Sequence, residues 1–544
     1  MKMDFSDIFL SKGVNYFSDD VPLKAILSFL KIKPDRNLNS LGKFVSEELI
    51  EVSAIVDHYS RPVLQTWNIT DDRLDAIWLS PDHSRMLQKM QELGVVRSAV
   101  ETGAIANHFL SGYIISDPGF YCTLTLTAQT AYALQKYADP DTKSAFLPRY
   151  LDVADPWYGA TYYTEIQGGS DLGANLACAS FENGKWTINS DNKYFASNAG
   201  IADGAIVTAR PAGSEAGTKG LAVFFVPARN SSGQLNYNVR RLKDKLGTIS
   251  VPTGEVEMHG SEAYLLGDKK YGIYYAMEIL MISRIDDAIS AAGIARKALW
   301  ESYLYACKRI AFGKRIIDQP LLLSDFLQME ADLEASTVLS LMAADMFSRA
   351  SSMKPPYGEG YNMARVYSHI AKNNASWVSD SITRYCMEIF GGKGFLKEFP
   401  IEKFHRDSIV TSIWEGTSNI QALDLLALLL KKNIHVAIME ELLAGARNLK
   451  DESWRVKVSA SIQHEFDAIK KWLSGGDREI YAKDVLNALA GAISLVQLFM
   501  LSDLDSSRRF TQVASIFYYK HFTDHVGMPA SLLKSDAIQW MNRD

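Results

Sequence analysis

The sequence predicts a mainly helical fold with an inserted β domain, which is an α+β architecture. Helical periodicity runs from about residue 38 to 150 and returns after Gly272, whereas short β-type runs separated by Gly, Asn, Asp and Pro occupy about 156 to 270. The predicted domains are a helical domain at 1–155, a β domain at 156–270, a four-helix bundle at 271–433 and an appended helical domain at 434–544.

Turn-forming residues divide these regions further. Asp139 and Pro140 are expected to end a small-residue helix, and the Ser-, Pro- and Gly-rich segment 351–358 is expected to connect two long helices. Within the β region, β-branched and aromatic residues predict strands around 186–188, 205–208, 221–226 and 254–258.

The composition is that of a folded globular chain. Of 544 residues, 47% are apolar and 22% are charged, and the net charge of -6 gives no global attraction for nucleic acid. The four cysteines form no C-x-x-C pair and are expected to be reduced core thiols. Charged residues interrupt the N-terminal 30 residues, so we expect no membrane helix there, no membrane contact and a cytoplasmic location.

Residues 162–171 read YYTEIQGGSD and stand at the entry to the β region. The adjacent Gly168 and Gly169 would let backbone N–H groups approach a ligand closely. A plain loop is the alternative interpretation. The serine-hydrolase pattern G-x-S-x-G does not fit, because Leu172 stands where its second glycine is required.

Two further segments carry possible chemistry. In residues 192–198, NKYFASN, strand geometry would place Phe195 and Ser197 on one face, which suits a flat heteroaromatic ligand or a half-buried strand. Residues 388–395, EIFGGKGF, do not fit the dinucleotide fingerprint G-x-G-x-x-G. They are followed by residues 413–421, IWEGTSNIQ.

In order and spacing, these segments resemble the acyl-CoA dehydrogenase family over roughly residues 80 to 433. The family's T-E-P-G-A-G-S-D is matched by TEIQGGSD at 164–171, its W-I-T by residues 195–197, and its Y-E-G-T by WEGT at 414–417. Residues 309–313, RIAFG, with Gln319 beyond them, match its R-x-x-F-G and following Gln. The resemblance implies the family fold: a helical domain, a middle β-barrel or sandwich, and a C-terminal helical bundle.

The Gln-Gly-Gly form of the first motif, the Phe-x-Ser form of the second, residues 241–247 and the C-terminal extension resemble the AidB-like branch, associated with the bacterial response to alkylation. Ile166 replaces the family's Pro and Phe195 its Trp, which leaves flavin binding expected but the substrate range open.

The resemblance implies FAD as cofactor and a set of binding residues. Residues implied to hold FAD are Tyr163, Thr164, Gln167, Ser170, Phe195, Ser197, Trp414, Thr417 and Asn419. Residues implied to reach the FAD of a neighbouring subunit are Arg309, Phe312, Gln319, Gly391 and Gly392, which makes a homotetramer the expected assembly. Residues implied at the acyl-CoA substrate are Ser170, Arg284 and Gly416.

Glu415 matches the family's catalytic base, which takes an α-proton from the acyl-CoA while the β-hydride passes to flavin N5. Desolvation by Trp414 and Ile413 would make its carboxylate a stronger proton acceptor. The alternative is a carboxylate that satisfies free N–H groups at a helix start. Arg284 has its own alternative, an intrahelical pair with Asp287.

Two function classes follow. The first is an enzyme of acyl-CoA dehydrogenation in fatty acid metabolism, whose flavin is reoxidised by an electron-transfer protein or by O2. The second is an AidB-like flavoprotein that binds DNA with little turnover. From residue 434 onward there are 13 Lys and Arg against 14 Asp and Glu, so the appended domain lacks the basic excess that DNA binding requires, and the enzyme is favoured.

The appended domain is expected either to organise the tetramer or to lengthen the acyl tunnel. His521 and His525 share a helix face there near Asp524, but no third ligand is indicated, so no metal is expected.

Overall fold

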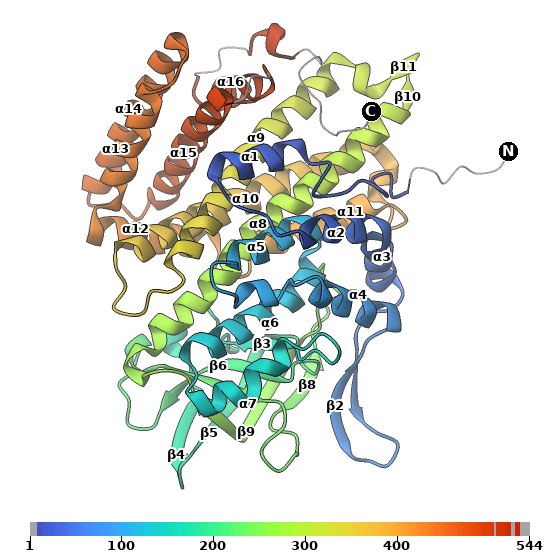
Figure 1. The fold of residues 1–544 in the computed structure, drawn as a ribbon, viewed down its shortest axis with the longest axis vertical. Helices are drawn as coiled ribbons and strands as arrows, with labels where there is room; N and C mark the ends of the chain where they lie inside the picture. Colours follow the sequence, from blue (N-terminus) through green and yellow to red (C-terminus); the bar gives the residue numbers. More distant parts are fainter. Residues whose placement is uncertain (1–7, 505–507, 524–527, 534–544) are drawn as a thin grey trace, which may run out of the picture. The chain divides into compact units, whose positions relative to one another are not determined.

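The computed structural model of the chain describes residues 8–504, 508–523 and 528–533. The first seven residues of the N-terminal segment, together with Asp524 and His525, lie outside this range. The chain forms two compact units, one made of 48–286 and the other of 1–47 with 287–544. The mainly helical fold with a β-rich middle region is confirmed (Figure 1). The four-domain division remains a prediction.

Helices of the first unit begin with strong local signals. The helices are α3 (Ile50–His58), α4 (Pro81–Glu92), α5 (Ile105–Ile115), α6 (Pro118–Tyr137) and α7 (Pro140–Tyr150). Three of them start with a Ser or Asp cap followed by proline; in α7, Asp139 accepts hydrogen bonds from the backbone N–H groups of Asp141 and Thr142. The predicted break at Asp139 and Pro140 is therefore confirmed.

A hairpin of β1 (Val63–Trp67) and β2 (Arg73–Trp78) departs from the expected helical pattern of this region. Its turn explains the departure. Asn68 accepts hydrogen bonds from the backbone N–H groups of Thr70 and Asp72 through its side-chain oxygen. Asp71 takes a left-handed φ of 63°. The side-chain bonds of Asn68 satisfy backbone groups in this turn, so the segment does not continue as a helix.

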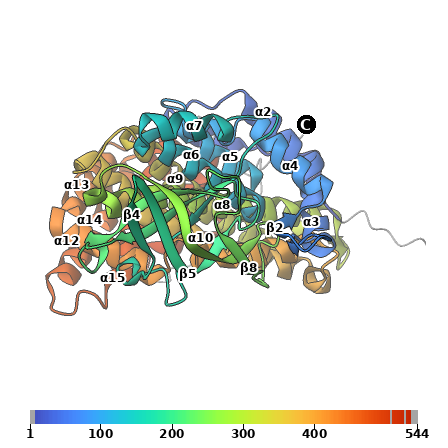
Figure 2. The ribbon, with the colours of Figure 1, turned by 90° about the horizontal axis from the view of Figure 1, so that it is seen from below.

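The seven-stranded sheet contains all four predicted strand regions. Its strands are β3 (Gly159–Tyr162), β4 (Cys178–Glu182), β5 (Lys185–Ser197), β6 (Gly204–Pro211), β7 (Ala222–Pro227), β8 (Asn238–Leu242) and β9 (Thr253–Leu265). The order is β3-β6-β4-β5-β9-β7, and β8 pairs with β9. Figure 2 shows β4 and β5 side by side in this sheet. Because β7 also pairs with β6, the path closes into a ring. β7 is buried along its whole length, as its continuous apolar run requires.

Helices make up most of the second unit. They are α1 (Val21–Leu30), α2 (Asn37–Phe44), α9 (Pro320–Ala350), α10 (Glu359–Ile389), α11 (Pro400–Ile409) and α12 (Ser418–Lys432). α8 (Gly272–Lys308) begins in the first unit and continues into this one. α10 packs against α9, α11 and α12, and the predicted connection at 351–358 separates α9 from α10 as expected (Figure 1).

The appended region adds α13 (Ile434–Arg447), α14 (Glu452–Ser474), α15 (Ala482–Leu504) and α16 (Arg508–His521). By length and composition, α15 is the single helix in the described ranges that could cross a membrane. Within the protein, however, 78% of its apolar window is buried, and the helix packs against α9, α10, α12 and α16. This burial is what a core helix shows.

The cysteines differ in part from the expectation of core thiols. All four are free, but only Cys386 is buried. Cys122 and Cys307 are half-buried. Cys178 is exposed at the start of β4.

A buried charge network fixes α16 to the bundle. The guanidinium of Arg509 lies 2.9 Å from the carboxylate of Glu330 and also pairs with Glu334, both on α9. Arg296 on α8 pairs with the other oxygen of Glu330 at 2.5 Å. The appended region is thus tied to the bundle by charges that are 7% exposed or less at each side chain.

We predict that Arg509→Met lowers the free energy of unfolding by about 3 kcal/mol or more, because it leaves two buried carboxylates short of a cation. Chemical denaturation of the purified protein measures this. The neighbouring Arg508 is exposed, so Arg508→Met is the matched control and should change stability by less than about 0.5 kcal/mol. Equal losses in both variants would contradict the prediction.

Candidate active site

The predicted site residues divide between the two units, and each half has its own geometry. The first unit holds Tyr163, Thr164, Gln167, Ser170, Phe195, Ser197 and Arg284. The second holds Arg309, Phe312, Gln319, Gly391, Gly392, Trp414, Glu415, Gly416, Thr417 and Asn419.

A buried ion pair supports the loop that follows β3. The Nζ of Lys193 lies 2.9 Å from Oε1 of Glu165, and both side chains are almost fully buried. Glu165 also accepts hydrogen bonds from the backbone N–H groups of Leu176 and Ala177 at 2.6 and 3.0 Å. Burial opposes ionisation of Glu165, but the charge of Lys193 and the hydrogen bonds from Lys193, Leu176 and Gln167 together lower the pKa of the carboxyl. The buried ion pair therefore holds the loop in place.

Glycine is required in this loop by close packing. A Cβ on Gly169 would lie 2.4 Å from Oγ1 of Thr164, whereas one on Gly168 would meet nothing within 4 Å. The Nε2 of Gln167 donates to Glu165 at 2.8 Å and to the carbonyl of Ala174 at 3.1 Å, so its amide holds the loop in shape.

The prediction that Phe195 and Ser197 share a face of β5 is confirmed. Ala196 between them is fully buried, whereas Phe195 is 55% exposed and Ser197 half-buried. The hydroxyls of Ser197 and Thr253 lie 3.1 Å apart. An exposed aromatic ring beside a hydroxyl gives this strand a surface that suits a flat ligand.

Other predicted residues of this half differ in exposure. Ser170 is exposed and Thr164 half-buried, so both can reach a ligand from the loop. Tyr163 and Arg284 are each 4% exposed in the chain by itself.

Lys243 stands over the aromatic pair of β5, and sequence reasoning gave it no role. Its Nζ lies 3.1 Å from the centroid of the Tyr194 ring and 5.3 Å from that of Phe195. Glu255 on β9 holds it there and also pairs with Arg241. Although burial favours the neutral acid, hydrogen bonds from Arg241 and Lys243 lower the pKa of Glu255 to about 2. The segment 241–247 stood out in the sequence, but its contacts depend on β9.

In the second unit, the structure brings Arg309 together with Gly391 and Gly392. They line a cavity of about 450 Å3 with Tyr305, Ile316, Ile389, Phe390 and Lys393. Neither Gly391 nor Gly392 would bring a Cβ within 4 Å of another atom, so their backbone is open to a ligand. Phe312 and Gln319 lie outside this lining. Phe312 is 97% exposed at the turn between β10 (Ile310–Ala311) and β11 (Lys314–Arg315).

Glu415 lies in a tight turn between the short helix η8 (Val410–Ser412) and α12. It adopts a left-handed φ of 57°, and Gly416 follows at 101°. For a residue with a Cβ this conformation costs roughly 1–2 kcal/mol, so surrounding interactions must compensate for it. Glu415 is half-buried, and Ile413, expected to help desolvate it, is 58% exposed in the chain by itself.

Buried side chains hold this turn by its backbone. Gln421 donates from Nε2 to the carbonyls of Glu415 and Gly416 at 3.0 and 2.9 Å, and its own Oε1 is 2.7 Å from Nδ1 of His369. The Nζ of Lys372 donates to the carbonyl of Gly416 at 2.8 Å. Both carbonyls of the left-handed segment are thereby satisfied.

Trp414 is held in turn by Asp287. Its indole N–H donates to the Oδ1 of Asp287 on α8. The other oxygen of Asp287 lies 3.6 Å from Nζ of Lys372, and both side chains are buried. Burial raises the pKa of Asp287 well above its usual range, Lys372 and the Trp414 bond oppose this, and the charge of Glu415 raises it further.

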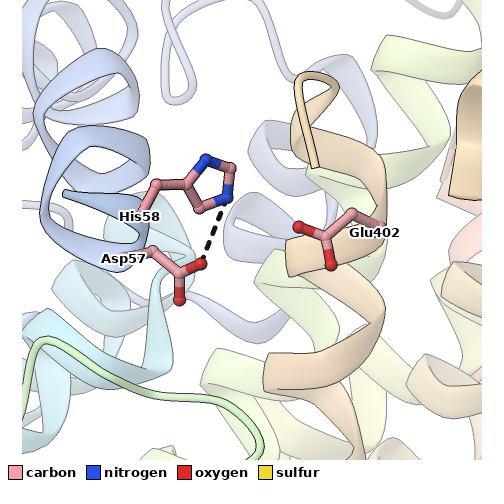
Figure 3. Close-up of side chains that lie close together, drawn as sticks. All are labelled: Asp57, His58 and Glu402. Atoms are coloured by element: carbon pink, nitrogen blue, oxygen red, sulfur yellow. Dashed lines mark ion pairs between the residues drawn. The ribbon is translucent and has the colours of Figure 1, made fainter. Parts of the chain in front are cut away.

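Among residues 8–504, 508–523 and 528–533, no three possible metal ligands of the same unit come together. Asp57 and His58 at the end of α3 form an ion pair at 3.3 Å (Figure 3). Glu402, also drawn there, belongs to the other unit and pairs with Arg406, so the three carry no argument for a metal site. His521 is bound to Asp332 on α9 at 2.7 Å, and its proposed partner His525 lies outside the described residues.

Two family models match the chain. "Acyl-CoA dehydrogenase, middle domain" matches residues 160–261, and "Acyl-CoA dehydrogenase, C-terminal domain" matches residues 270–430. These ranges contain every predicted site residue.

Curated relatives and a solved structure agree with these matches. Acyl-CoA dehydrogenase family member 11 of Caenorhabditis elegans is 27% identical over 88% of this chain and 82% of its own. An acyl-CoA dehydrogenase of Bacillus subtilis is 32% identical over 53% and 72%, and the putative acyl-CoA dehydrogenase AidB of Escherichia coli is 32% identical over 49% and 48%. The crystal structure of Caenorhabditis elegans ACDH-11 in complex with C11-CoA superposes with a TM-score of 0.82, 23% identity, and coverage of 95% and 92%.

The charges around Phe195 give a pH prediction. Because the pKa of Glu255 is lowered to about 2 in the folded protein, its contribution to stability is present above the unfolded value of about 4.3. It is lost as the pH falls from about 5 towards 2. We expect the thermal midpoint of Glu255→Gln to fall less steeply over the acid range than that of the native chain.

The control is Glu182→Gln, which removes an exposed carboxylate at the end of β4. It should keep the native slope. Parallel curves for all three proteins would sink the assignment of Glu255.

Proposed function

Because the chain belongs to the acyl-CoA dehydrogenase family, we propose that it dehydrogenates an acyl-CoA between the α and β carbons, with Glu415 as the base. The chain is an FAD-dependent oxidoreductase. The observation that carries the proposal is the turn of Glu415, a half-buried carboxylate held in a left-handed conformation by three buried side chains, Gln421, Lys372 and Asp287.

The residues present fit FAD. On the first unit, Phe195 offers an exposed ring, and Ser170 and the Gly168–Gly169 backbone offer polar groups on a loop that Glu165 holds. On the second unit, Thr417 and Asn419 are exposed at the start of α12. We assign these residues to flavin binding, and Arg309 with Gly391 and Gly392 to the flavin of a neighbouring subunit.

In the proposed reaction, Glu415 removes the proton on the α carbon, and its carboxylate becomes a neutral acid. When bound, FAD supplies the acceptor for the β-hydrogen, which leaves with its electron pair as the carbon–carbon double bond forms. The backbone N–H of Glu415 stabilises the negative charge that develops on the thioester oxygen. The left-handed turn orients both the carboxylate and this N–H, so a small change in its backbone would displace two catalytic groups together.

The finer predictions remain proposals. We place Ser170, Arg284 and Gly416 at the acyl-CoA, and we expect an electron-transfer protein as oxidant, a homotetramer and a cytoplasmic location. The AidB-like placement has weaker support than the family, because AidB matches about half of this chain, less than the worm relative does. The ACDH-11 complex is a reason to include an eleven-carbon acyl-CoA in any substrate panel.

Anaerobic titration of the purified flavoprotein with acyl-CoAs of increasing chain length tests the function. We expect the absorbance of the oxidised flavin to bleach in the native chain. In Glu415→Gln the rate of bleaching should fall by about 100-fold or more, because the amide cannot accept the α-proton.

The flavin content of Glu415→Gln should equal that of the native chain, which separates loss of the base from loss of the cofactor. A native flavoprotein that no acyl-CoA bleaches would refute the dehydrogenase assignment. Equal bleaching in both proteins would refute only the role of Glu415 as the base.

The alternative, DNA binding with little turnover, gives an opposite expectation. Since the appended domain carries 13 cations against 14 carboxylates, counterion release cannot drive binding there. We expect no band shift of duplex DNA at low salt. Tight binding that weakens steeply with salt would favour the alternative.

A further inference from the structure

The two residues that flank Glu415 are tied to the two members of one buried ion pair. Trp414, before it, donates its indole N–H to Asp287, and Gly416, after it, accepts from Nζ of Lys372. Asp287 and Lys372 then meet at 3.6 Å. These contacts connect α8, the turn and α10 to one another. Glu415 lies in the sequence between Trp414 and Gly416, the two turn residues that make the contacts.

Charged side chains in this position need a reason. Asp287 is 2% and Lys372 1% exposed, and burying two charges costs stability unless the pair is well compensated. The surrounding polar bonds compensate only in part, because one oxygen of Asp287 has the 3.6 Å ion pair with Lys372 and no closer hydrogen bond. Apolar side chains could fill the same space without this cost.

We propose that Asp287 and Lys372 are positioning residues that hold the turn of Glu415. The inference rests on the proposed function of Glu415. The cation fixes the Gly416 carbonyl, and the carboxylate fixes Trp414.

Other titratable groups of this unit lie further along the same helices. His369 on α10 contacts Gln421 through Nδ1, and its Nε2 is 4.0 Å from a carboxylate oxygen of Asp424 on α12. Arg365 lies 3.9 Å from the same oxygen of Asp424. Substitutions at Asp287 and Lys372 address the two groups that bond to Trp414 and Gly416.

The first test is Lys372→Met, which removes the bond to Gly416 and the compensating cation. Stopped-flow flavin reduction at saturating acyl-CoA should slow by at least tenfold, because small displacements of a catalytic group cost roughly 10- to 100-fold in rate. The control is Lys403→Met, which breaks another buried pair, Lys403 with Asp407 at 2.6 Å on α11. It should lose stability but keep the reduction rate within about threefold. Equal slowing in both variants would overturn the proposal.

The second test compares Asp287→Asn, which has nearly the same shape and can still accept the Trp414 indole N–H, with Asp287→Leu, which cannot. We expect flavin reduction to stay within about threefold of the native rate in Asp287→Asn and to slow by at least tenfold in Asp287→Leu. An unchanged rate in Asp287→Leu, or equal slowing in both variants, would refute the role of Asp287 in holding the turn.

A readout without turnover separates this inference from the proposed function. Displacement of the turn alters the surroundings of the bound flavin, so the absorbance of the oxidised cofactor should change in Lys372→Met and stay native in Lys403→Met. This change without any acyl-CoA reduction by the native chain would retain the inference and refute the dehydrogenase, whereas reduction by the native chain with no change in either variant would do the reverse.

Discussion

The chain must reverse direction between η8 and α12 through two left-handed residues, and one of them, Glu415, carries a side chain. Such a turn persists only when its surroundings hold it. Here the holding groups come from α8, α10 and α12, three helices that approach one another only in the folded bundle. The length and packing of the bundle helices therefore serve the placement of one carboxylate.

The two groups of predicted site residues, one in each unit, are held by the same kind of interaction. In each, a loop at the surface rests on a buried pair of opposite charges: Glu165 with Lys193 below the Gly168–Gly169 loop, and Asp287 with Lys372 below the turn of Glu415. A charged pair forms directional hydrogen bonds, which an apolar contact cannot form. It therefore fixes the loop backbone as well as filling space. Polar groups on such loops are held in place before any ligand arrives, which reduces the ordering cost of binding.

The sequence could predict the features that depend on local pattern. Strand β7 and the break between α9 and α10 follow from composition over a few residues. The role of Glu415 was predicted by the resemblance of WEGT at 414–417, and it stays a prediction. The β1–β2 hairpin was missed because its turn depends on side-chain bonds of Asn68 rather than on periodicity. Lys372 gave no signal and Asp287 only that of a possible partner for Arg284, since a lone charge in a helical pattern is most simply a solvated residue. Only the packing of α8 against α10 makes them partners.

The buried pair also bears on the choice between an enzyme and a binding protein. A protein that only held FAD and presented a surface would need Thr417 and Asn419, but it would gain nothing from charges buried behind Glu415. Those charges reduce stability relative to apolar packing, and they bond to the two residues that bracket the carboxylate rather than to the exposed side chains around it. The stability lost by burying these charges is localised next to one proton acceptor. Such a loss is explained if that acceptor takes part in a reaction whose rate depends on its orientation and basicity. The arrangement of Asp287 and Lys372 therefore favours turnover, independently of the balanced charge of the appended helices.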